Sequence, residues 1–124
     1  MYNKHLVLAL FHIFLVAPLF LTVAFMRSAT PIWLYWVLVA LGVIILIYHS
    51  YRLIARWRAG SPYLWVNAIH VFLVAPLLIF VGAGQKNGPR YGYELLAMSG
   101  FAVFGYHVYS LIGELQAIDR TAAL

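Results

Sequence analysis

Four long apolar stretches constrain this chain more than any other feature. Of its 124 residues, 65% are hydrophobic and only 9% are charged, whereas a soluble domain carries roughly 25% charged residues. Each stretch is close to the roughly 20 residues that an α-helix needs to cross a bilayer. The expected membrane-spanning helices are residues 6–26, 32–54, 64–81 and 91–112. We therefore predict an all-α, multi-pass integral membrane protein.

Short polar segments separate these stretches, at 27–31, 56–62 and 82–90. Connections this short make neighbouring helices antiparallel, so we expect an up-down four-helix bundle. In such a bundle the first and third helices are diagonal partners, as are the second and fourth. Pro18 and Pro76 fall in the middle of their helices and predict a kink in each, because proline cannot donate a backbone hydrogen bond.

The sequence repeats itself at a fixed spacing. Residues 11–19 (FHIFLVAPL) return as 69–77 (IHVFLVAPL), and residues 48–54 (YHSYRLI) return as 106–112 (YHVYSLI), both at an offset of 58. One offset across both helices of a hairpin indicates a tandem duplication, with repeats at 1–58 and 59–116 and a C-terminal tail at 117–124. Because each repeat has an even number of helices, both copies have the same orientation in the membrane.

Basic residues give an orientation and argue against some partners. The formal net charge is +5 and there is no cysteine, so disulfides and thiolate metal sites are excluded. The basic residues are scattered at helix ends, which favours anchoring to a lipid bilayer and disfavours nucleic acid as a partner. One side of the membrane would collect Lys4, Arg52, Arg56, Arg58 and Arg120, and the other Arg27, Lys86 and Arg90. By the positive-inside rule, both termini are predicted to be cytoplasmic.

Each predicted helix carries one histidine, and all four histidines are expected at one depth. At about 1.5 Å per residue, His12 lies about 12 Å from Lys4, and His49 about 10 Å from Arg56. His70 and His107 follow at the offset of 58. Gly42 and Gly100 lie two turns from His49 and His107, and small residues favour close helix approach, so we expect these histidines to face inward. Ionisable residues inside a membrane usually mark a functional site.

Several chemistries fit such a histidine layer near the cytoplasmic side. Three or four imidazoles suit copper, zinc or iron, and four ligands at one level favour a single ion slightly. A b-type haem would take two of the histidines as axial ligands, with Gly42 and Gly100 making room for the ring and Arg52 pairing with a propionate. Either would suit electron transfer. Ligation of a chlorophyll magnesium needs outward-facing histidines, and a proton relay needs a second ionisable layer.

A rival interpretation makes the protein a structural or assembly subunit of a larger membrane complex. Its histidines would then make hydrogen bonds between helices. A small channel or transporter is a third alternative. No hydrolase or phosphate-binding motif is found, so no catalytic residue is predicted and enzymatic activity stays open. Membrane-protein partners and a homo-oligomer both remain open as well.

Overall fold

The computed structural model describes residues 3–124, and every regular element in that range is a helix. The first membrane helix consists of α1 (Lys4–Phe11), a π-helical turn η1 (His12–Val16) and α2 (Ala17–Met26). The second is α3 (Ile32–Arg58). The third repeats the composition of the first, with α4 (Leu64–Ile69), a π-helical turn η3 (His70–Val74) and α5 (Ala75–Gly84). The fourth is α6 (Arg90–Ala122), and short 3₁₀ turns η2 (Arg27–Ala29) and η4 (Gln85–Asn87) follow α2 and α5.

These elements form helices at Lys4–Ala29, Ile32–Arg58, Leu64–Asn87 and Arg90–Ala122, all long and apolar enough to cross a membrane. The predicted multi-pass membrane protein is confirmed at that level. The helices extend beyond the apolar stretches at several ends. The largest extension is in α6, which continues to Ala122 without a break, so residues 117–122 of the predicted tail are helical.

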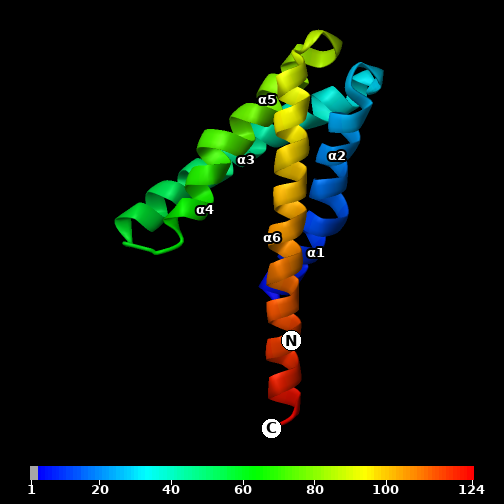
Figure 1. The fold of residues 1–124 in the computed structure, drawn as a ribbon. Helices are drawn as coiled ribbons and strands as arrows, with labels where there is room; N and C mark the ends of the chain where they lie inside the picture. The colour runs from blue at the N-terminus through cyan, green and yellow to red at the C-terminus, as the bar shows by residue number, and fades with distance from the viewer. Residues whose placement is uncertain (1–2) are drawn as a thin grey trace.

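The helices associate as two pairs (Figure 1). The terminal pair consists of Lys4–Ala29 and Arg90–Ala122, with α1 and α2 packed against α6. The middle pair consists of Ile32–Arg58 and Leu64–Asn87, with α3 packed against α4 and α5. Figure 1 shows the pairs meeting at the end that carries η2 and η4 and diverging towards the end where the chain termini lie. An evenly packed bundle is therefore not seen along the whole length of the helices.

A buried pair of tyrosines holds the two helix pairs together where they meet. The hydroxyl oxygens of Tyr35 and Tyr93 are 2.8 Å apart. Tyr35 donates to the backbone carbonyl of Arg27, and Tyr93 donates to that of Gln85, each at 2.6 Å. Arg27 and Gln85 both have φ of 50°, which ends the preceding helix and leaves carbonyls that need a donor. The tyrosines supply that donor and join α3 to α6.

The prolines in mid-helix give π-helical turns. Pro18 and Pro76 have no N–H to donate, so the helix cannot continue its regular ladder at that point. The preceding N–H groups, of Ala17 and Ala75, donate five residues back to the carbonyls of His12 and His70. Each turn therefore holds one extra residue and begins at a histidine. Such π-bulges occur frequently at functional sites.

Candidate functional site

The histidine rings stack in two pairs, one in each helix pair. His12 of the first membrane helix stacks on His107 of α6, with ring centroids 4.2 Å apart and planes 15° apart. His49 of α3 stacks on His70 of the third membrane helix, at 4.1 Å and 11°. We call these the terminal stack (His12, His107) and the middle stack (His49, His70). Each stack brings together the two histidines of its helix pair at one level.

In two of the four histidines, a backbone carbonyl of the same helix defines the tautomer. The Nδ1 atoms of His12 and His70 lie 2.7 and 2.6 Å from the carbonyl oxygens of Leu8 and Val66, one turn back in the same helix. A carbonyl only accepts, so Nδ1 carries the proton in each ring and Nε2 keeps its lone pair. Histidines that ligate metals in proteins commonly have this arrangement, in which the second nitrogen donates to a carbonyl or carboxylate and fixes the ring.

Asn67 takes part in the middle stack and was not predicted from the sequence. Its side chain is 2% exposed, and its Oδ1 lies 2.9 Å from Nδ1 of His49. Its Nδ2 is buried without a hydrogen-bond partner. The signal was present in the sequence: Asn67 is a polar residue inside an apolar stretch, three positions before His70, where the first repeat has Ala9.

The surroundings of the stacks are aromatic. Tyr48 packs edge-on against His49, and Tyr106 packs edge-on against His107, with ring centroids 5.1 and 5.2 Å apart. Both tyrosines are exposed. No hydrogen bond joins a tyrosine hydroxyl to a histidine in residues 3–124, so backbone carbonyls and Asn67 are the polar partners of the imidazoles.

Five imidazole nitrogens of the four histidines make no hydrogen bond within residues 3–124. Within the described chain, Nε2 makes no hydrogen bond in any of the four histidines, and neither ring nitrogen of His107 does. All four side chains are partly exposed. The layer therefore offers lone pairs from both helix pairs.

The predicted arrangement of four histidines around a single ion has no support in this geometry. Among residues 3–124, no three His, Asp or Glu side chains come together as a group that could hold a metal ion. The physical reason is the pairing itself. Two rings stacked face to face present their edges side by side, whereas the ligands of one ion must converge on a point.

The other predicted site residues are Gly42, Gly100 and Arg52. A Cβ on Gly42 would meet side-chain and backbone atoms of α5, and a Cβ on Gly100 would meet side chains of α2. Both glycines therefore contact a neighbouring helix and allow close packing within each pair. Arg52, one turn from His49, has no carboxylate partner, since the ion pair found in residues 3–124 is Arg90–Glu94.

Comparison of the chain with protein-family models, with curated proteins and with solved structures gives no match.

Proposed function

We propose that this protein is a membrane-embedded b-type haem protein that carries electrons, in which His12 and His70 would hold the haem iron. The observation that carries the proposal is the pair of Nδ1–H···O=C bonds to Leu8 and Val66. They leave two lone pairs, on Nε2 of histidines from different helix pairs, without any hydrogen-bond partner. Two axial imidazoles are what a b-type haem requires, and three converging ligands are not needed.

Other features favour a haem held by two histidines over a metal ion held by three or four. His107 and His49 stack on the proposed ligands and would fix their ring planes. Arg52 is the free cation nearest in sequence to His49 and would pair with a propionate. When bound, haem supplies a one-electron couple, and the chain's residues hold its iron and limit access of water.

We also propose that the chain is a tandem duplication. The π-helical turns at His12–Val16 and His70–Val74, the 3₁₀ turns at Arg27–Ala29 and Gln85–Asn87, and the paired Tyr35 and Tyr93 are each separated by 58 residues. The same offset converts the terminal stack into the middle stack. Duplication accounts for the presence of two equivalent ligands, one in each repeat, with both termini on the cytoplasmic side.

The test is spectroscopic. The full chain, expressed with a supply of haem and purified in detergent, should show a Soret band and the visible bands of a low-spin bis-histidine haem. His12→Ala and His70→Ala should each abolish them. His49→Ala and His107→Ala should keep most of the haem, with shifted bands, because these rings only support the ligands. His5→Ala, at an exposed position, is the matched control and should change nothing.

A colourless, metal-free protein that keeps its helical circular dichroism would overturn the haem proposal. Stoichiometric copper, zinc or iron without a Soret band would also overturn it, in favour of the metal site expected from the sequence.

A structural role is the second candidate, and the stacking itself favours it. Each stack joins two helices, and the His49–Asn67 bond joins α3 to α4. In an assembly subunit, each of the four histidine-to-alanine variants would lower stability, His49→Ala most because Asn67 would lose its partner, and no absorbing cofactor would be found. Unfolding of the same four variants, measured beside their spectra, therefore separates the two candidates.

A further inference from the structure

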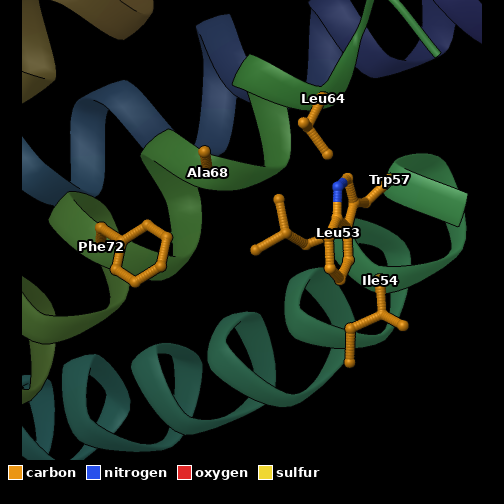
Figure 2. A pocket seen from close by; sticks show the side chains of 6 residues that line it. All are labelled: Leu53, Ile54, Trp57, Leu64, Ala68 and Phe72. Carbon is orange, nitrogen blue, oxygen red and sulfur yellow. The ribbon is translucent and has the colours of Figure 1, made fainter. Parts of the chain in front are cut away.

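A small groove on the middle pair has only apolar side chains around it. It has a volume of about 300 Å³ and is lined by Leu53, Ile54 and Trp57 of α3, Leu64 and Ala68 of α4, and Phe72 of η3. Figure 2 shows Trp57 and Leu64 at one end of the groove and Phe72 at the other. From Leu64 to Phe72 the helix rises about 12 Å. The groove thus runs along the helices, from the turn between α3 and α4 into the apolar part of the molecule.

Two arginines that have no carboxylate partner in the described part of the chain, Arg56 and Arg58, lie next to Trp57 in the sequence, at the end of the groove near the turn. Arg56 is adjacent to Trp57, and its Nη1 donates to the carbonyl of Tyr63, the residue before Leu64, at 3.1 Å. Arg58 is the last residue of α3. Neither arginine has a carboxylate partner within residues 3–124. A guanidinium has five N–H donors in a planar fork that matches phosphate geometry, so most of the donors of Arg56 remain available.

We propose that this groove binds one acyl chain of an anionic phospholipid, whose phosphate is held by Arg56 and Arg58. The apolar lining excludes a polar ligand from the groove, and the unpaired arginines at its mouth select a negative headgroup. Trp57 stands between them, at the level where interfacial indoles favour the boundary between headgroups and acyl chains. The occupant therefore has one apolar part and one anionic part, as an anionic phospholipid does.

The other helix pair provides an internal control, because it lacks the key features at the same offset. The residues 58 positions from Arg56, Trp57 and Arg58 are Glu114, Leu115 and Gln116. The position of Ala68 is taken by Leu10, whose larger side chain would fill the space. Both the cavity and the charge thus belong to the middle pair. Ala68→Leu introduces a residue that the protein already has at the equivalent place, so this variant should fold.

The test uses Trp57 as a reporter of the lipid that touches it. The full chain, with Trp33, Trp36 and Trp65 changed to Phe, is reconstituted in vesicles of phosphatidylcholine that contain a small fraction of brominated lipid. Brominated acyl chains quench an adjacent indole. We expect brominated phosphatidylglycerol to quench Trp57 at a roughly five- to tenfold lower mole fraction than brominated phosphatidylcholine, since each arginine near the surface attracts anionic lipid. High salt should reduce this preference.

Three variants of the reporter protein complete the test. Ala68→Leu should raise the mole fraction needed for quenching by both lipids, because the chain is displaced from the groove. The double variant Arg56→Gln, Arg58→Gln should remove the preference for phosphatidylglycerol while quenching by phosphatidylcholine continues. Leu10→Ala, in the terminal pair, should leave the quenching of Trp57 unchanged. Circular dichroism checks that each variant keeps its helices.

Two outcomes would overturn the proposal. Equal quenching by the two lipids, with no effect of the arginine variant, would mean that the groove holds any acyl chain without selection. Quenching that falls as the protein-to-lipid ratio rises, whatever the headgroup, would mean that a second copy of the chain covers the groove.

Discussion

The terminal and middle helix pairs share one plan but differ in how closely their helices approach. In the middle pair, a Cβ on Gly82 of α5 would lie 2.6 Å from the backbone oxygen of Tyr35, and one on Gly42 would lie 3.1 Å from that of Ala75. In the terminal pair the position of Gly82 is held by Ala24, which already has a Cβ, and Gly100 faces only side-chain atoms of Leu21 and Phe20. The middle pair is therefore packed backbone to backbone.

The middle stack also has a polar contact between its helices that the terminal stack lacks within residues 3–124. In the middle stack, Asn67 bonds to His49 across the helix pair, whereas in the terminal stack the equivalent residue is Ala9, which is fully buried. The two imidazoles therefore stack without help from an asparagine, since the ring centroids of the terminal stack are 4.2 Å apart and those of the middle stack 4.1 Å apart. The middle pair has acquired an extra interaction, and the following variants measure what it contributes. They are ordered by the expected difference between the two pairs.

The largest difference is expected for Gly82→Ala. The added methyl group would meet backbone atoms of α3, which cannot rotate away, so the helices must separate. Overpacking of this kind costs about 1–3 kcal/mol in the free energy of unfolding. Denaturant titration of the protein in micelles measures it. Gly105→Ala is the control: a Cβ there has nothing within 4 Å, so the variant should gain up to about 1 kcal/mol from helix propensity. Equal effects would contradict the backbone-to-backbone packing of the middle pair.

A smaller difference is expected between His49→Ala and His107→Ala. Both remove a stacked ring, worth about 0.5–1.5 kcal/mol. Removing His49 also leaves the buried Asn67 amide without any partner, which adds about 1–3 kcal/mol. Unfolding in micelles should therefore rank His49→Ala as the more destabilised. Combining His49→Ala with Asn67→Ala should recover most of the additional loss, and failure to recover it would show that the bond to Asn67 is not its source.

Gly42→Ala and Gly100→Ala should differ by about 1 kcal/mol. The methyl group on Gly42 meets the carbonyl of Ala75, which is fixed, while the one on Gly100 meets the tip of Leu21, which can change rotamer. We expect a loss of stability for the first variant and a nearly neutral result for the second, measured by the same titration. The reverse order would place the closer helix approach in the terminal pair.

Tyr35→Phe and Tyr93→Phe should show no difference between the pairs. Each removes one donor to a carbonyl and one hydroxyl from the shared contact, at a cost of about 1 kcal/mol. Loss of the Tyr35 hydroxyl leaves the Arg27 carbonyl without its donor, and loss of the Tyr93 hydroxyl leaves the Gln85 carbonyl without its donor. Each variant also removes the contact between the two hydroxyls, so the two losses are equivalent. A clear inequality in the unfolding free energies would mean that the tyrosine pair serves one helix pair more than the other.

The sequence predicted the four membrane-spanning helices well, because hydropathy and length alone decide whether a helix can cross a bilayer. It underestimated α6, since Glu114, Gln116 and Asp119 lower hydropathy without ending a helix. The prolines in mid-helix predicted a kink in each helix, and the structure has a π-helical turn before each proline. A missing N–H can produce a kink or a π-helical turn, and which one results depends on the packing of the helix around it.

The histidine layer as a cofactor site stays a prediction. Spacing along the sequence predicted a common depth for the four histidines, but stacking depends on how each helix is rotated about its axis, and residue spacing along separate helices does not define that rotation. For the same reason the expected convergence on one ion could not be checked until His12 was seen beside His107 and His49 beside His70. Asn67 could have been found from the sequence, as a polar residue about one turn before His70 at a position where the first repeat has Ala9.

The pairing of the helices also has a consequence for biosynthesis. The first helix, Lys4–Ala29, packs against α6, which is synthesised after both helices of the middle pair, while the middle pair is made of consecutive helices. Because translation adds about 5–20 residues per second, the first helix would be in the bilayer for several seconds before α6 is available to pack against it. During that interval the ring of His12 lacks the stacking partner that α6 provides, so we expect the terminal pair to be the later of the two pairs to become stable during synthesis.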